Sequence, residues 1–329
     1  MAYQPLRLTV TLETVTPLFL GGAVPSEAPE LRPSSFRGVM RYWLRAAVGG
    51  ILGDRSLKDL HKAEDAVFGS TGRASPVEVR LAHDRLNHQS YNPLPHKERR
   101  FRFEGYEPRQ PIRLTLSGRR ASMVSWNAAV GALLLSVGLG GLGRRSRRGF
   151  GSLRLRHADV SQAQLPPAWE ELLKSTPGSA TEWERYLRTV LETAAVAARG
   201  LVESLGAPVS TPSQPSRFPL LGADSEITIC HRKFPSGRAA LQAFGQFEHE
   251  FLVQHPQARN AFGSADPRWA SPLWIRVLPV EGGFILGLTV LWSEPPSGVA
   301  AERGALLEFV KLCAHEWNDR PVVGQEVTQ

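Results

Sequence analysis

A loop rich in glycine and arginine is the part of this sequence best suited to chemistry with a charged partner. Residues 138–151 read GLGGLGRRSRRGFG, with six glycines, four arginines and no acidic residue. Glycine lets a backbone approach a ligand closely, and the arginine guanidinium donates in a planar fork that matches phosphate oxygens. The loop is therefore expected to lie along a polyanion. Its candidate binding residues are Gly140, Gly141, Gly143, Arg144, Arg145, Arg147 and Arg148.

The loop also satisfies the letters of a dinucleotide-binding fingerprint, GxGxxG, at Gly138, Gly140 and Gly143. That fingerprint needs a strand before it and the start of a helix after it. Here an apolar helix is expected before the loop, and arginines follow it. The pattern therefore speaks against a dinucleotide site and favours contact with an RNA backbone. A flexible basic loop that only faces solvent is the alternative.

A second group of arginines falls on an expected helix. Arg37, Arg41 and Arg45 recur every four residues, so they form one row with about 6 Å between neighbours along the helix axis. This separation is close to the phosphate spacing of a single strand, and Arg32 stands just before the helix. The row predicts an extension of the RNA-binding surface, and a solvated charged face is the alternative.

Basic and aromatic residues alternate in a third stretch, which suits a flexible hairpin that binds nucleic acid. A merely solvated loop explains it equally well. The residues are His96, Lys97, Arg99, Arg100, Phe101, Arg102 and Phe103.

Catalytic patterns are weak in this chain. Its nine histidines are scattered, and His249-Glu250 lacks the second histidine that a zincin helix needs. His61 and His157 are the only histidines near the arginine-rich elements, where one could act as a general base in metal-free RNA cleavage. We predict no catalytic residue, metal or cofactor.

The order of elements predicts an α+β fold. Strand-like alternation over 6–15 is followed by a helix that Ser34 or Ser35 would cap. Further elements are expected at 57–67 (helix), 75–81 and 111–117 (strands), 123–137 (helix) and 152–156 (strand). This is the βαββαβ arrangement of a ferredoxin-like unit, which is also the frame of the RNA-recognition motif.

The pattern restarts after a helical insert and a Pro/Ser-rich linker at 206–219. Residues 220–329 predict a second ferredoxin-like unit, βαββα, without a clear last strand. Phe68-Gly69-Ser70 and Phe262-Gly263-Ser264 fall at the same topological place in the two units, which indicates duplication. We therefore predict domains at 1–160 and 220–329, with a helical insert and linker at 161–219. The apolar surface of the helical part, residues 166–205, would dock a neighbouring subunit.

Composition agrees with a nucleic-acid partner. The 329 residues carry a formal net charge of +8, which favours RNA over an acidic partner. Two cysteines cannot build a disulfide framework, so a reducing, cytoplasmic setting is expected. We see no signal peptide and no apolar run long enough to span a membrane.

Several of these motifs, in this order, resemble the RAMP superfamily of CRISPR proteins. They are residues 16–22 (TPLFLGG), 30–45 (ELRPSSFRGVMRYWLR), 63–70 (AEDAVFGS) with Ser75-Pro76-Val77, and the loop at 138–151. Within the superfamily, the likeness is greatest to the first subunit of type III-B (Cmr) effector complexes. It covers residues 5–157 well and the region 220–320 more weakly.

The resemblance implies two ferredoxin-like domains in a cytoplasmic ribonucleoprotein complex that serves antiviral defence. The partners would be guide RNA (crRNA), target RNA and other RAMP subunits, with no membrane and no small-molecule substrate. This subunit would hold the 3′ part of the guide and would not cut RNA. A RAMP endoribonuclease that matures precursor guide RNA is the alternative.

Overall fold

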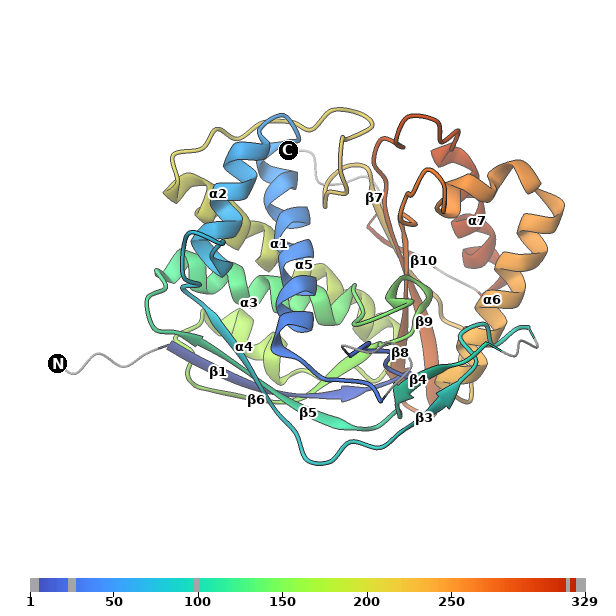
Figure 1. Cartoon of the computed structure of the whole chain (residues 1–329), viewed down its shortest axis with the longest axis horizontal. Coiled ribbons are helices and arrows are strands. Elements are labelled where there is room, and N and C mark those ends of the chain that lie inside the picture. The colour runs from blue at the N-terminus through green and yellow to red at the C-terminus, as the bar shows by residue number, and fades with distance from the viewer. Residues whose placement is uncertain (1–5, 23–27, 98–100, 318–319, 324–329) are drawn as a thin grey trace.

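The chain builds two four-stranded antiparallel sheets that stand beside one another, each covered by helices (Figure 1). The computed structural model describes residues 6–22, 28–97, 101–317 and 320–323. Counted within each sheet, both have the strand order fourth, first, third, second. The two halves therefore share one connectivity.

The first sheet has the order β2-β5-β1-β6 and comes from the N-terminal half. Its strands are β1 (Leu6–Thr14), β2 (Glu78–Ala82), β5 (Pro111–Gly118) and β6 (Leu153–Gln162). Leu6, Leu8, Val10 and Leu12 are buried on one face of β1, which confirms the predicted alternation. Because alternate side chains point to opposite faces, threonines and charged residues of β1 lie on the other face.

Helices cover the apolar face of this sheet (Figure 1). They are α1 (Pro33–Leu52), α2 (Leu57–Phe68), α3 (Met123–Gly138), α4 (Pro167–Lys174) and α5 (Ala180–Ser204). The predicted serine cap of α1 is wrong: the helix begins at Pro33, and its cap position, Arg32, makes no side-chain capping bond. Proline suits this first position because it lacks an N–H that would stay unpaired.

Helix α5 packs on α1 and α3 with its apolar face. Trp183, Leu187, Val190 and Leu201 of α5 belong to the same buried core as the first sheet. The prediction that the apolar surface of the helical insert docks a neighbouring subunit is therefore wrong, because this chain buries that face itself.

The second sheet has the order β10-β7-β9-β8. Its strands are β7 (Ser225–Ile229), β8 (Leu273–Val280), β9 (Gly283–Leu291) and β10 (Arg320–Val323), with α6 (Gly237–Gln254), the 3-10 helix η2 (Pro256–Phe262) and α7 (Arg303–Glu316). The sequence predicted no clear last strand, but β10 pairs antiparallel with β7. A four-residue strand that contains proline is too short to show a periodic pattern.

A separate hairpin formed by β3 (His88–Tyr91) and β4 (Phe103–Tyr106) lies at the lower right of the molecule, near α6 (Figure 1). The basic and aromatic stretch that starts at His96, for which the sequence predicted a flexible hairpin, falls between these two strands in the sequence and ends at the first residue of β4. Tyr106 exchanges two backbone hydrogen bonds with Leu18, and its hydroxyl donates to Pro29 O at 2.6 Å. These contacts fix the base of the hairpin against the segment that follows β1.

The Pro/Ser-rich segment at 206–219 is tied to the end of α1 by a buried carboxylate. Asp54 accepts bonds from the Ser213 hydroxyl, from Ser213 N at 2.9 Å and from Arg217 N at 2.7 Å. Burial opposes the charge, but these hydrogen bonds outweigh it and lower the pKa of Asp54 to about 2. The segment therefore packs along the first half of the molecule.

Candidate nucleic-acid interface

The glycine- and arginine-rich loop lies at the joint between the two halves. It leaves α3, forms a short 3-10 turn, η1 (Ser146–Arg148), and enters β6. Arg148 forms an ion pair with Glu248 of α6 at 3.0 Å and donates to Ser271 Oγ and Phe262 O, each at 3.2 Å. All three partners belong to the second half, so Arg148 fastens the two halves together.

Arg147 also points into the second half. Its Cζ lies 4.5 Å from the ring centroid of Trp274 and 5.4 Å from that of Tyr42, and it donates to Ser271 O. Burial lowers the pKa of Arg147 and also that of Arg145. Three of the four loop arginines are therefore turned into the protein.

The glycines of the loop serve close packing. A Cβ on Gly140 would collide with Trp43 Nε1 and lie 2.8 Å from Ser136 O, and Gly141 is buried against Phe150. Gly143 has a φ of +83°, and a Cβ there would collide with Phe19 O. The backbone at Gly140 and Gly141 is covered by protein and offers no exposed surface to a ligand. The predicted contact between loop amides and a ligand therefore stays a prediction.

Arg144 is the loop arginine that faces solvent, and its side chain and that of Arg32 both lie against Gly21. Its Nη2 would lie 2.6 Å from a Cβ on Gly21, and Arg32 Nη2 donates to Gly21 O at 2.9 Å. Its Cζ also lies 5.6 Å from the ring centroid of Phe103. Phe101, 61% exposed, packs edge-on against Phe103 at 4.7 Å. We call this cluster of Gly21, Arg32, Phe101, Phe103 and Arg144 the Gly21 surface.

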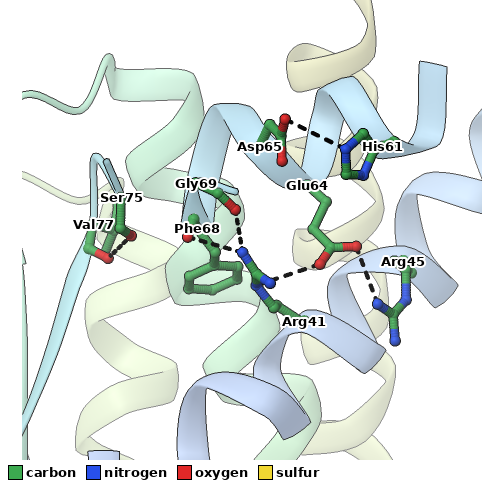
Figure 2. Close-up of polar contacts among 9 residues, drawn as sticks. All are labelled: Arg41, Arg45, His61, Glu64, Asp65, Phe68, Gly69, Ser75 and Val77. Carbon is green, nitrogen blue, oxygen red and sulfur yellow. Dashed lines mark hydrogen bonds and ion pairs between the residues drawn. The ribbon is translucent and has the colours of Figure 1, made fainter. Parts of the chain in front are cut away.

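The arginine row of α1 is partly compensated by one acid from α2. The buried Glu64 forms ion pairs with Arg41 Nε at 3.3 Å and with Arg45 Nη1 at 3.1 Å (Figure 2). Arg37 is exposed, and no carboxylate within the described ranges lies within 4.0 Å of it. The spacing of the row was predicted correctly, but only Arg37 keeps its full charge toward solvent.

Arg41 also donates to Phe68 O at 3.0 Å and to Gly69 O (Figure 2). Phe262 O receives Arg148 in the same way. Gly69 and Gly263 both have positive φ, and the serine after each forms an isolated antiparallel bridge, Ser70 with Arg73 and Ser264 with Trp269. The two Phe-Gly-Ser elements are therefore equivalent turns, each held by an arginine.

The basic stretch that starts at His96 divides into a buried part and an exposed part. His96 packs against Gly245 of α6, and burial, reinforced by Lys97, lowers its pKa to about 4. Phe101 and Arg102 are exposed. Arg99 and Arg100 lie outside the described residues.

The two candidate histidines lie on different elements. His61 is on α2 and forms an ion pair with Asp65 at 3.6 Å (Figure 2), and His157 is exposed on β6. Neither touches the Gly21 surface in the contacts of the described residues. In that same part of the chain, no cluster of His, Cys, Asp or Glu has three members close enough to hold a metal ion.

The first sheet also has an open face, but its chemistry differs from that of an RNA-recognition motif. Arg7, Thr9 and Thr11 of β1 and Arg113 and Thr115 of β5 lie on this face. None of its four strands contains a Phe, Tyr or Trp. Base stacking on a central sheet is therefore not available, and the exposed aromatic surface lies on the hairpin instead.

The loop and the α1 arginines fall in a region with known relatives. The family model of the RAMP superfamily matches residues 11–154. This part of the chain is therefore similar to the RAMP superfamily, in agreement with the resemblance of its motifs.

Individual proteins similar to this chain are subunits of CRISPR Cmr systems. The chain is similar to "CRISPR system Cmr subunit Cmr1-1" of Pyrococcus furiosus, with 28% identity over 305 residues, which cover 82% of this chain and 83% of that protein. It is 29% identical to subunit Cmr1-2 of the same organism over 177 residues, or 44% of this chain and 92% of that protein.

Solved structures show the same fold. The crystal structure of Cmr1 from Pyrococcus furiosus (apo form) gives a TM-score of 0.70 at 22% identity, covering 97% of this chain and 99% of that one. A chain in the cryo-EM structure of the type III-B Cmr-beta complex bound to cognate target RNA gives 0.64 at 12% identity, covering 94% and 100%. In the described part of this chain, no helix is both long and apolar enough to cross a membrane.

Proposed function

We propose that this chain is a non-catalytic RNA-binding subunit of a type III-B CRISPR effector complex, where it contacts the 3′ part of the guide RNA, the target RNA, or both. The likeness to Cmr1 over most of both chains supports the place in such a complex. Other RAMP subunits would be its protein partners, and the role would be antiviral defence in the cytoplasm.

The observation that carries RNA binding is the convergence of two arginines on Gly21. Arg32 and Arg144 are far apart in sequence, yet both guanidinium groups contact this one glycine, which has no side chain to cover them. Arg32 also pairs with Glu30 at 3.7 Å, so Arg144 supplies the excess positive charge at this exposed site, and a net positive charge favours an anionic ligand. Phe101 and Phe103 lie beside them and offer ring faces for bases, as in other single-strand binding sites.

The geometry divides the candidate binding residues into two groups. Arg32, Arg37 and Arg144 are exposed and would contact phosphates, and Arg45, 43% exposed, would assist at the other end of the row. The remaining residues hold the fold around that surface. They are Arg41, Arg145, Arg147, Arg148, Gly140, Gly141 and Gly143.

We also propose that the two sheets belong to two ferredoxin-like units that arose by duplication, with boundaries near 1–160 and 220–329 and a helical insert between them. The identical strand order of the two sheets supports this, as do the equivalent Phe-Gly-Ser turns. The specificity of the complex would come from base pairing of the guide with its target, while the protein reads the backbone.

A paired substitution tests the RNA-binding role. Arg32→Glu with Arg144→Glu removes two phosphate contacts from the Gly21 surface. Each contact with a single strand contributes about 0.7 to the slope of log K against log salt, so the slope should flatten by about 1.4. Fluorescence anisotropy with a labelled single-stranded RNA measures both affinity and slope.

The matched control is Arg188→Glu with Arg199→Glu, which places the same charge change on exposed positions of α5. The control should bind RNA almost as the wild type does. Equal losses in both pairs would mean that only net charge matters and would contradict a site at Gly21. A gel of the same reaction, run with a repeat-containing RNA and no metal, should show intact RNA, and cleavage that His61→Ala or His157→Ala abolishes would favour the endoribonuclease instead.

A further inference from the structure

A large cleft opens between the two halves, beside the β3–β4 hairpin. Its volume is about 1190 Å³, and it is bordered by the end of β1, the β3–β4 hairpin, the start of β6 and the N-terminus of α6. Figure 1 shows these elements meeting at the lower right of the molecule. Small-molecule sites measure about 300–1,000 Å³, so this cleft is larger than a single metabolite requires.

The cleft is strongly cationic. Four arginines and one acid line it, and the acid, Glu13, is already paired with Arg154 at 2.6 Å. The other three arginines, Arg102, Arg109 and Arg238, are exposed and have no carboxylate within 4.0 Å in the ranges that the structure describes. An uncompensated positive field inside a concave surface concentrates anions.

The walls of the cleft are flat and rigid. Five prolines line it, namely Pro17, Pro95, Pro108, Pro235 and Pro279. Because the proline ring fixes φ, such walls lose little freedom when a ligand binds. Tyr91 and Phe284 add aromatic surface, and the amides of Gln89 and Asn92 add hydrogen-bonding groups.

The start of α6 adds a further preference for anions. Ser236 Oγ accepts only from Ala239 N, at 3.1 Å, and the N–H groups of the first helical residues, Gly237 and Arg238, have no partner within the helix. The positive end of an 18-residue helix dipole therefore lies at the wall of the cleft beside the Arg238 side chain.

The cleft and the Gly21 surface are linked by contacts of one buried ring. Phe19 lies 6.2 Å from Tyr91 and 4.8 Å from Phe150 on the cleft side. The same ring lies 5.3 Å from Phe103 on the Gly21 side. The Phe19 ring thus packs between aromatic residues of the two cationic surfaces.

We propose that this cleft binds a short stretch of single-stranded RNA, a few nucleotides long, with phosphates on Arg109 and Arg238 and bases against Tyr91, Phe284 and the prolines. The proposal rests on the RNA-binding function proposed above and extends it to a second site. A duplex is too bulky for this volume. An acidic peptide would use the arginines but would leave the flat apolar walls without a matching partner.

The test replaces two cleft arginines without reversing their charge. Arg109→Gln with Arg238→Gln should weaken the binding of a labelled single-stranded RNA to the full-length chain about tenfold near 0.15 M salt, since two phosphate contacts are lost. The matched control is Arg188→Gln with Arg199→Gln on α5, which should bind within twofold of the wild type. Arg109→Lys with Arg238→Lys should retain most of the affinity.

A second readout follows the arginines directly. RNA should protect Arg109 and Arg238, but not Arg188, from modification by phenylglyoxal, as read by mass spectrometry. If wild-type protein binds no RNA, both the proposed function and the cleft site fail. If the Arg32/Arg144 pair weakens binding while the cleft pair does not, and RNA protects neither cleft arginine, only the cleft site is overturned. If the cleft pair binds RNA like the wild type but no longer binds neighbouring subunits, the cleft binds an acidic protein partner. That result would also overturn the proposed RNA site in the cleft.

Discussion

Two arginines four residues apart in one loop are expected to have opposite roles, and replacing each by methionine separates them. Arg148 connects the halves through Glu248, Ser271 and Phe262. The Arg144 side chain contacts Gly21 and Phe103 of the Gly21 surface. We predict that Arg148→Met lowers the free energy of unfolding and leaves the RNA salt slope unchanged. Arg144→Met should change the free energy of unfolding little and should flatten the RNA salt slope.

The magnitudes follow from the contacts. Stranding one member of a fully buried ion pair costs about 3–5 kcal/mol, and because 20% of Arg148 and 13% of Glu248 are still exposed, we expect the low end, about 3 kcal/mol. Arg144 is exposed, and its cation–π contact with Phe103 contributes about 0.5–1 kcal/mol. A difference of about 2 kcal/mol should therefore separate two variants that make the same change in charge.

Urea denaturation of the full-length chain, followed by fluorescence, measures both free energies of unfolding. Arg148→Met combined with Glu248→Gln should regain part of the loss, because the second change removes the stranded charge. Equal destabilisation by Arg144→Met and Arg148→Met would refute the assignment of Arg148 to the joint. So would a flatter RNA salt slope for Arg148→Met in anisotropy.

Three further changes test the packing that holds the interface. Asp54→Asn should lower the free energy of unfolding by about 2 kcal/mol above pH 4. The pKa of Asp54 in the folded protein, about 2, lies below its value in the unfolded chain. The difference between wild type and variant should therefore vanish as the pH falls toward 2, which a series of urea denaturations at different pH values measures. Gly140→Ala should cost about 1–3 kcal/mol in thermal or chemical unfolding, since its methyl group would collide with Trp43. Gly38→Ala, which meets nothing within 4 Å on the exposed side of α1, should instead raise stability by about 0.5–1 kcal/mol, and a loss there would contradict the packing described.

Local patterns predicted the elements that a single periodicity defines. The alternation at Leu6–Thr14 and the apolar stripe of α1 are present as expected. Features that depend on partners far away in sequence were missed. The linker expected at 206–219 is held by Asp54, and the short strand β10 exists because β7 offers it an edge.

The same distinction applies to the candidate interface. Residue types and spacing identified the arginines of α1 and the loop, but they could not show where each side chain goes. Glu64 comes from another helix and pairs with both Arg41 and Arg45, and Glu248 comes from the other half and pairs with Arg148. The convergence of Arg32 and Arg144 on Gly21 likewise depends on tertiary structure.

The most direct test of the central claim, that single-stranded RNA binds at the Gly21 surface, is a map of ultraviolet crosslinks between the full-length chain and an RNA that carries 4-thiouridine. The exposed ring of Phe101 and the partly buried ring of Phe103 should be the principal crosslinked residues, and crosslinking there should fall in the Arg32→Glu/Arg144→Glu variant. Crosslinks confined to α5 or to β2, with none at the Gly21 surface, would contradict the account.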